Sequence, residues 1–447
     1  MKNAALGILL FTVASRLVRV AGRWDEWALH YATYNEATRD ALLSGNIVEA
    51  LTSWVGLHPP GYPLLHSVVS LVWPAPIVWL LISAGASVVT VWAMLRSHPQ
   101  TVIPALVVAT DPVQLHYAAE VNNYPLATML LALAWMAHRR DHPVLLGVVA
   151  FLACWVHLIC AVGVGLIAAT SRYRYSLYAV MTGAGLLLAP EAIGIVMDEG
   201  SRKQPPLDLV LSLRDALDRF GPSWVVLLPL LVGSLHRSKQ AGILWVGLVT
   251  VWVSTVWAGF AAPHQFPYAC FLGIPAAALI GASTVSRHRL AVGVSGVLII
   301  RGLFAGLSDG MAVSQVAQDQ SRSRAIDVVL ERAVKGDAII LVRGPGPPDD
   351  DKRHTSSVLW RFSPFTEAHP IRTDGRSTIE GHPFLIDGVR VYTFAHPRAA
   401  IGAIEGPRVF TILYDGAEQN PNLIPAHPSQ GDWQPVGPDL WRATIGS

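Results

Sequence analysis

Long apolar segments, separated by short polar or basic connections, dominate the first two thirds of the chain. They fall at residues 2–20, 77–95, 101–119, 125–138, 143–171, 175–197, 222–236, 241–262, 266–285 and 290–308. A helix that spans the hydrocarbon core of a membrane needs about 20 mostly apolar residues. The pattern therefore predicts a mainly α, polytopic bundle of about eleven transmembrane helices. The first segment carries Arg16 and Arg19 where a cleavage site needs small residues, so we interpret it as an uncleaved anchor.

The basic residues of the short connections indicate how the helices are oriented, because Lys and Arg concentrate on the cytoplasmic side of a membrane. The turns at 120–124 and 263–267 contain neither residue type. A consistent orientation requires residues 143–171 to cross twice, as two short helices that meet near His157. It places the N-terminus in the cytoplasm and the tail outside. The basic connections hold Arg96, Arg139, Arg140, Arg172, Arg174, Arg237, Lys239, Arg287 and Arg289.

A polar loop at residues 21–76 follows the first helix and is predicted to lie outside. Aromatic and apolar side chains recur at helical spacing over residues 24–44, which predicts an amphipathic helix on the membrane surface. Residues 58–73 are apolar but interrupted by prolines, so we expect them to dip into the interface without crossing.

The composition changes at residue 309, where long apolar runs stop and Ser, Asp, Arg, Pro and Gly become more frequent. The sequence predicts a transmembrane domain at 1–308 and a small soluble α/β extracytoplasmic domain at 309–447. Within the tail it predicts a helix at 318–335 and strands at 337–342, 389–394 and 409–414.

Composition supports an integral membrane protein in contact with membrane lipids, and we expect that membrane to be the plasma (inner) membrane. Charged residues make up 14% of the 447 residues, against about 25% in soluble domains, and the mean hydropathy is +0.41. The net charge of +2 and the lack of a basic run argue against nucleic acid as a partner. Cys154, Cys160 and Cys270 lie in apolar segments without metal-ligand spacing.

Two polar features of the outer loop could carry chemistry. Asp25 and Glu26 could supply a general base, or could be a solvated pair at the first turn of a surface helix. His58, in the His58-Pro59-Pro60 turn, could bind a phosphate or its metal ion, or could be incidental to a rigid turn.

Further polar residues lie at or within the predicted membrane region. The turn after residue 119 carries Glu120, Asn123 and Tyr124, which could bind a sugar or an acceptor, or could form an ordinary polar turn. Ionisable groups in apolar segments are functional candidates, with structural helix–helix pairs as the alternative. These groups are Asp111, His157, Glu191, His264 and Arg301.

Taken together, these features resemble the membrane-embedded GT-C glycosyltransferases that use polyprenyl-phosphate sugars. The groups it resembles most are bacterial relatives of protein O-mannosyltransferases, lipid A aminoarabinose transferases and Rgt-type transferases. Asp25-Glu26 matches the Asp-Glu pair of that family, and residues 58–65 resemble its His-Pro-Pro-Leu-Tyr motif. Residues 112–126 resemble its Pro…Tyr-Ser-x-Glu-x-Arg-x-Tyr-x-Leu turn.

Weaker matches are His157, the 265–275 segment and the 336–339 segment. The chain also departs from the family. Asn122 stands where the turn usually carries Arg, and Gln265 or His264 replaces the Arg of a late Arg-Tyr segment. Both changes remove a fixed cation that could hold a lipid phosphate.

The resemblance implies an inverting hexosyl- or pentosyltransferase of the cell envelope. It would move a sugar from a polyprenyl-phosphate donor to a hydroxyl of a glycan, lipid or protein acceptor on the outer face. Asp25 would be the general base, and Glu26 would orient it or bind the acceptor. A divalent metal ion at Asp25, Glu26 and His58 is left open, with no other cofactor expected. The expected substrate-binding residues are His58, Tyr62, Glu120, Asn123, Tyr124, His157, His264, Gln265 and Arg301. The alternatives are a transporter (flippase) for lipid-linked sugars and a degenerate, non-catalytic relative.

Overall fold

A computed structural model provides the three-dimensional structure of the chain. It describes residues 2–21, 36–52, 59–72, 76–119, 121–185, 239–257, 271–285, 289–307, 338–342, 384–386, 389–394, 409–413, 433–437 and 440–443. The chain divides into two compact units. One consists of Met1–Gly22, Thr38–His66 and Ile77–Asp309, and the other of Arg23–Ala37, Ser67–Pro76 and Gly310–Ser447. These units are defined by internal contacts and not by a side of the membrane, so the domain assignment to 1–308 and 309–447 stays a prediction.

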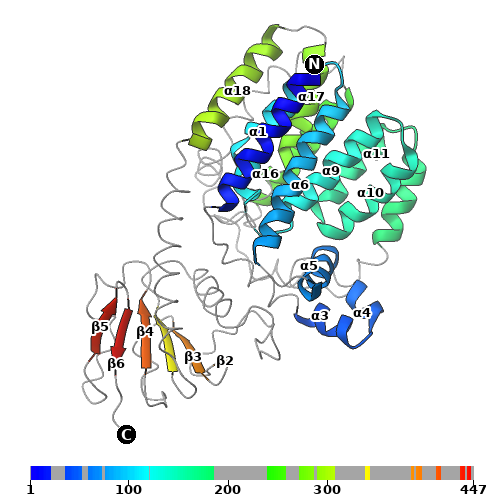
Figure 1. Cartoon of the computed structure of the whole chain (residues 1–447). Helices are drawn as coiled ribbons and strands as arrows, with labels where there is room; N and C mark the ends of the chain where they lie inside the picture. The colour runs from blue at the N-terminus through cyan, green and yellow to red at the C-terminus, as the bar shows by residue number, and fades with distance from the viewer. Residues whose placement is uncertain are drawn as a thin grey trace. The chain divides into compact units, whose positions relative to one another are not determined.

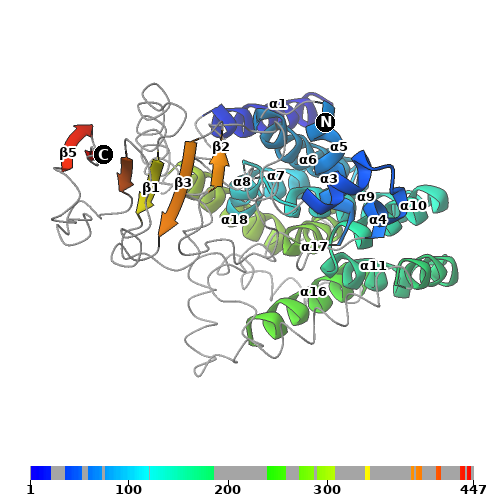
Figure 2. The ribbon, with the colours of Figure 1, turned by 90° about the horizontal axis from the view of Figure 1, so that it is seen from below.

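The described parts of the apolar segments are helical, which confirms the prediction of a mainly α bundle (Figure 1). The helices are α1 (Lys2–Ala21), α3 (Glu36–Leu43), α4 (Ile47–Thr52), α5 (Gly61–Val72), α6 (Pro76–Ser97), α7 (Ile103–Thr110), α8 (Pro112–Tyr117), α9 (Tyr124–Arg139), α10 (Pro143–Val156), α11 (Ile159–Thr170), α16 (Lys239–Trp257), α17 (Gly273–Val285) and α18 (Arg289–Leu307). Helix α10 packs on α9, and α16 runs beside both α17 and α11 (Figure 2).

Among the described residues, two helices are long and apolar enough to cross a membrane by length and composition alone, at Lys2–Val20 and Val78–Ser97. Shorter apolar helices occur at Pro143–Val156, Ile159–Thr170, Gly273–Ala282 and Ala291–Phe304. The predicted number of crossings therefore stays a prediction. The predicted amphipathic helix at 24–44 is described only in its last part, where α3 lies.

Helices α7 and α8 are two pieces of one apolar segment, interrupted at the Asp111–Pro112 step that the sequence marks as a break. Pro112 has no N–H group, and the N–H of Val113 donates to Asp111 Oδ1 over 3.2 Å. The carbonyl of Ala109 thus loses its regular helical donor. Arg16 Nη1 on α1 donates to that carbonyl over 2.7 Å, so a side chain from another helix satisfies the break.

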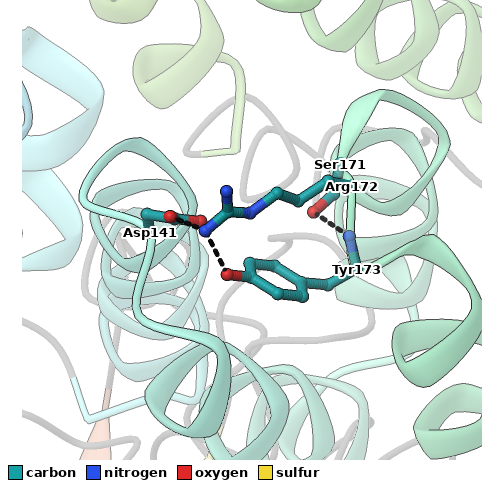
Figure 3. Close-up of polar contacts among 4 residues, drawn as sticks. All are labelled: Asp141, Ser171, Arg172 and Tyr173. Atoms are coloured by element: carbon teal, nitrogen blue, oxygen red, sulfur yellow. Dashed lines mark hydrogen bonds and ion pairs between the residues drawn. The ribbon is translucent and has the colours of Figure 1, made fainter.

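Helices α10 and α11 form a hairpin that turns at His157. The far ends of the hairpin are joined by an ion pair between Arg172 and Asp141 (Figure 3). Arg172 also donates to the hydroxyl of Tyr173 over 2.6 Å, and the N–H of Tyr173 donates to the hydroxyl of Ser171 over 3.1 Å. Because both ends of 143–171 lie together, the prediction of two short helices that meet near His157 is confirmed.

Several basic connections lie at this same end of the helices. Arg140 Nε donates to the carbonyl of Arg96 over 3.0 Å. His138 Nε2 lies 3.2 Å from Gln240 Oε1, and Gln240 Nε2 donates to the carbonyl of Thr170 over 3.2 Å. Connections that are far apart in the sequence therefore meet at one end, as the charge pattern predicts. The orientation of that end toward the cytoplasm stays a prediction.

The second unit contains a six-stranded mixed sheet with the order β2-β3-β1-β4-β6-β5. Its strands are β1 (Ala338–Val342), β2 (Phe384–Ile386), β3 (Val389–Phe394), β4 (Val409–Leu413), β5 (Trp433–Gly437) and β6 (Leu440–Ala443). Strand β1 pairs in parallel with β3 and β4, and the other pairs are antiparallel. A continuous apolar run such as that of β1 is typical of a central parallel strand. The three predicted strands are confirmed as β1, β3 and β4, and the predicted helix at 318–335 lies outside the described residues.

Candidate active site

Parts of three sequence motifs meet at the end of the helices opposite the basic connections. The rings of Tyr124 and His157 lie 5.5 Å apart between centroids, and those of His157 and Phe271 lie 5.3 Å apart. Gly61 packs against the end of α10, where a Cβ atom would lie 2.7 Å from the carbonyl oxygen of Trp155. The start of α9, the α10–α11 turn, the start of α5 and the segment before α17 therefore converge. We refer to Tyr124, His157 and Phe271 as the aromatic row.

The turn before α9 sets the position of Tyr124. The side-chain oxygen of Asn122 accepts a hydrogen bond from the N–H of Tyr124 over 3.1 Å, as Asn does in tight turns. Asn123 is fully buried at the N-cap position, immediately before the helix. The ring of Tyr117 meets that of Tyr124 edge to face, with centroids 5.5 Å apart at 67°. The predicted residues Asn123 and Tyr124 thus lie together in the structure.

His157 has a fixed orientation at the turn of the hairpin. Its backbone is extended, with φ −156° and ψ 128°, which ends α10. The N–H of Ile159 donates to His157 Nδ1 over 3.2 Å. In a neutral ring the hydrogen is therefore on Nε2. The side chain is held by its own turn and by the two aromatic rings beside it, and is 8% exposed.

The start of α5 brings the second motif to this region. Pro59 and Pro60 are buried, and the N–H of Leu64 donates to the carbonyl of Pro60 over 2.8 Å, so the turn leads directly into the helix. Tyr62 is buried in the first turn. Its ring lies 6.2 Å from that of His66, and His66 in turn stacks on Trp79 of α6 at 3.7 Å and 16°.

Arg301 lies in a second polar group, which is built around the α7–α8 break. Asp111 interacts electrostatically with both Arg16 and Arg301. Arg16 is fully buried and also donates to the hydroxyl of Ser87 over 3.2 Å. Within the part of the chain that the structure describes, Asp111 Oδ2 and Arg16 Nη2 are buried without a hydrogen-bond partner. The structure therefore assigns Arg301 a neighbour in Asp111, while the expected role in substrate binding stays a prediction.

Several predicted site residues lie outside the described residues, namely Asp25, Glu26, His58, Glu120, His264 and Gln265. The proposed metal donors are among them. In the described ranges, no group of three or more His, Cys, Asp or Glu side chains could hold a metal ion. The roles of these residues and the use of a metal stay predictions.

The structure adds three residues that the sequence did not single out, namely Tyr117, Trp155 and Phe271. Tyr117 and Phe271 lie in segments that carry the family resemblance, and their positions in these motifs mark them as candidates in the sequence. Trp155 has no such signal. Its importance depends on contacts with α4 and α5, more than 90 residues away in the sequence.

No family model matches the sequence, and no curated protein matches it. Solved structures do match. ArnT from Cupriavidus metallidurans bound to undecaprenyl phosphate superposes with a TM-score of 0.59 at 12% identity, over 100% of this chain and 99% of that one. The same protein in the apo state gives a TM-score of 0.54 at 12% identity, over 99% and 98% of the two chains.

These structures establish the fold. ArnT is a lipid A aminoarabinose transferase of the GT-C family, one of the groups that the sequence motifs resemble. The chain shares the fold of ArnT. The expectation of a GT-C-type fold is confirmed.

Proposed function

We propose that this chain is an inverting membrane glycosyltransferase that moves a sugar from a polyprenyl-phosphate donor to an acceptor hydroxyl. One observation carries the proposal. Gly61 of the His-Pro-Pro motif, Tyr124 of the polar turn and His157 converge at one end of a helical bundle with the ArnT fold. A matched ArnT structure is bound to undecaprenyl phosphate, which supports a polyprenyl phosphate as the carrier.

The reaction needs a base and a stabilised leaving group. Asp25 takes the proton of the acceptor hydroxyl as its oxygen attacks the anomeric carbon. The bond from that carbon to the phosphate oxygen breaks, and the electron pair leaves with the polyprenyl phosphate. Because a phosphate is a stable leaving group, it needs hydrogen-bond donors and positive charge more than protonation. His58, His264 and Gln265 are our candidates for that task, and Glu26 orients Asp25.

The membrane setting is supported by α1, which exposes a continuous apolar stripe. Leu6, Leu10, Val13 and Leu17 recur at helical spacing and are 38–61% exposed. Exposed apolar surfaces of this kind mark contact with a membrane or a partner. We assign the stripe to lipid and place the basic end of the helices in the cytoplasm and the aromatic row toward the outer leaflet.

The test is sugar transfer in membranes from a radiolabelled polyprenyl-phosphate sugar pool to native acceptors. Asp25→Asn should lower transfer about 100-fold or more, the usual contribution of a general base. Asp141→Asn removes a carboxylate at the end of the helices opposite the aromatic row and is the matched control, with transfer expected near wild type. Both variants are compared at equal expression and membrane insertion. Full activity in Asp25→Asn overturns the assignment of the base.

A lipid-linked sugar flippase is a second candidate, favoured by the broken helix α7–α8 and its buried Asp111. Transporters bind their substrates at interrupted helices near the middle of the membrane. Movement of the labelled lipid across liposomes without sugar transfer supports the flippase. Absence of both activities, over several sugars, supports a degenerate relative in which Asn122 marks the loss of the donor-binding arginine.

A further inference from the structure

Trp155, in the last turn of α10, contacts both ends of one segment of the outer loop. Its indole Nε1 donates to the carbonyl of Leu51 on α4 over 3.3 Å. Its own backbone carbonyl lies against Gly61, the first residue of α5. Leu51 and Gly61 flank residues 52–60, which include the His58-Pro59-Pro60 turn. The side chain of Trp155 therefore holds α4, and its backbone carbonyl contacts α5, at the same point on α10.

The contact at Gly61 is possible only for glycine. A Cβ atom there would lie 2.7 Å from the carbonyl oxygen of Trp155, 2.9 Å from its carbonyl carbon and 3.2 Å from Val156 Cγ2. Two of the three atoms belong to the backbone of α10, which cannot rotate away as the tip of a side chain can. Gly61 thus serves close packing of α5 on α10. Gly147, on the same helix α10, has no atom within 4 Å of its Cβ position and makes a matched control.

Trp155 precedes His157 by two residues, so the same turn of chain carries the anchor and the candidate site. His157 is fixed against Tyr124 and Phe271. A shift of α4 and α5 relative to Trp155 is therefore also a shift relative to the aromatic row. Misplacing a reacting group by about 1 Å can cost on the order of 100-fold in rate.

We propose that Trp155 is a positioning residue, which fixes α4 and α5 against the α10–α11 turn and thereby sets the placement of these two helices relative to the aromatic row. This inference rests on the proposed transferase function. It differs from a simple interfacial anchor, in which the tryptophan ring contacts only lipid and the nearby ring of Phe151. An anchor of that kind has no reason to hold two distant segments of the chain.

The test uses Trp155→Phe and Gly61→Ala in the full-length protein. Trp155→Phe keeps an aromatic ring beside Phe151 and removes the indole N–H. Gly61→Ala forces α5 away from α10. Each should lower kcat roughly 10- to 100-fold, with the KM for the labelled polyprenyl-phosphate sugar changed less than about threefold, because α4 and α5 are displaced while the aromatic row remains. The double variant should be no worse than the more impaired single variant, because both changes act at one junction.

Hydrogen–deuterium exchange gives a readout that does not depend on activity. Amides of α4 and of the first turns of α5 should exchange faster in Trp155→Phe and Gly61→Ala, and at the wild-type rate in Gly147→Ala. If the wild-type protein transfers no sugar, the proposed function fails. The exchange rates still show whether Trp155 and Gly61 hold α4 and α5 on α10. Faster exchange together with a wild-type kcat would show that the contact serves packing alone, and this result overturns the positioning role. Wild-type exchange and wild-type kcat overturn the whole inference. If Trp155→Phe does not fold, Gly61→Ala tests the α5 side of the same junction, and wild-type exchange with wild-type kcat in that variant overturns the inference.

Discussion

Asn122 stands where the resembled family carries an arginine, and the structure gives it a different task. Its side-chain oxygen accepts from the N–H of Tyr124 over 3.1 Å, and the residue is 5% exposed. An arginine has no acceptor and cannot make this bond. At this position the chain thus has a hydrogen-bond acceptor that fixes the neighbouring tyrosine, in place of the cation of the resembled family.

Asn122→Ala should lower the free energy of unfolding by about 1 kcal/mol, because a buried N–H loses its acceptor. Asn122→Asp retains an acceptor oxygen at the same place and should come closer to wild type. The midpoint of thermal unfolding in detergent measures both. Equal midpoints for Asn122→Ala and wild type would contradict the role of the side chain.

His98, just beyond the end of α6, predicts a dependence of stability on pH. Burial, with Arg139 as a second cause, lowers its pKa from 6.5 to about 4. Its Nε2 lies 3.5 Å from Trp135 Nε1. Below pH 6.5 the unfolded chain binds a proton that the folded chain does not, so stability falls as the pH falls from 6.5 to about 4.

His98→Gln keeps a hydrogen-bond acceptor for Trp135 and does not titrate. The free energy of unfolding of this variant should therefore fall less than that of wild type as the pH falls from 6.5 to about 4, by on the order of a few kcal/mol. Thermal unfolding of both proteins between pH 4 and 7 measures the difference. Parallel curves for wild type and His98→Gln would show that another group is responsible.

At the scale of elements, the α7–α8 break shows how opposite charges stabilise an interrupted helix. Arg16 donates to the Ala109 carbonyl at the C-terminal end of α7, and Asp111 caps the N-terminal end of α8. A cation at a helix C-terminus and an anion at an N-terminus both complement the helix dipole. The charges of Arg16 and Asp111 thus stabilise the break that Pro112 introduces.

Arg16→Met should destabilise the protein by roughly 2–4 kcal/mol, because it leaves the Ala109 carbonyl buried without this donor and Asp111 buried without this nearby positive charge. Ser87→Ala removes only one partner of Arg16 and should cost about 1 kcal/mol. Thermal unfolding in detergent distinguishes the two variants. A Ser87→Ala effect as large as that of Arg16→Met would contradict the role of Arg16 as the cap of α7.

The packing of α18 on α7 depends on one glycine. A Cβ atom at Gly302 would collide with the carbonyl of Thr110, whereas Gly293 on the same helix has open space around it. Gly302→Ala should therefore lower the unfolding midpoint. Gly293→Ala should leave it unchanged or raise it, since Ala favours a helix by up to about 1 kcal/mol. Similar midpoints for the two variants would argue against close packing at Gly302.

The sequence predicts the helices and strands that have a long apolar pattern, and it misses the strands that are too short or too irregular to show one. Apolar runs of 14 or more residues identify most of the described bundle helices. A continuous apolar run identifies β1, and runs rich in β-branched and aromatic residues identify β3 and β4. Strands β2 and β6 are too short, at 3 and 4 residues, to show a period. Strand β5 contains Pro435 and an irregular register, which argues against a strand in the sequence.

For the candidate site, the sequence predicts which residues are polar and where turns fall, but not which turns meet. Tyr124 and His157 were singled out separately, and only the packing of α9 on α10 brings their rings together. The anchor at Trp155 depends on α4 and α5 folding back onto α10. No periodicity in one sequence encodes such a contact between distant segments.

At the scale of the whole molecule, the ArnT fold persists at 12% identity. A membrane bundle can tolerate this divergence because lipid-facing positions require only apolar side chains. The features that we find in common with the resembled family are motif-bearing turns and the order of the motifs. These features fix the backbone more strongly than they fix individual side chains.

Orientation in the membrane is a prediction that belongs to this scale. Gln100→Cys, in the exposed connection after α6, should react with an impermeant maleimide only after the cytoplasmic face is opened. A cysteine appended after Ser447 should react in intact spheroplasts. Both are tested with Cys154, Cys160 and Cys270 replaced by Ser. The reverse labelling pattern would invert the topology and place the aromatic row inside the cell.

The α10–α11 hairpin has a further consequence, because its helices are short. With 14 and 12 residues, they rise about 21 and 18 Å at 1.5 Å per residue, whereas a bilayer hydrocarbon core is about 30 Å thick. Hydrophobic mismatch of this size thins the surrounding lipid or leaves the hairpin tip below the headgroups. Under the proposed function, bilayer thickness then determines how far a lipid-borne phosphate must sink to reach His157, and membranes built from shorter acyl chains should suit this protein best.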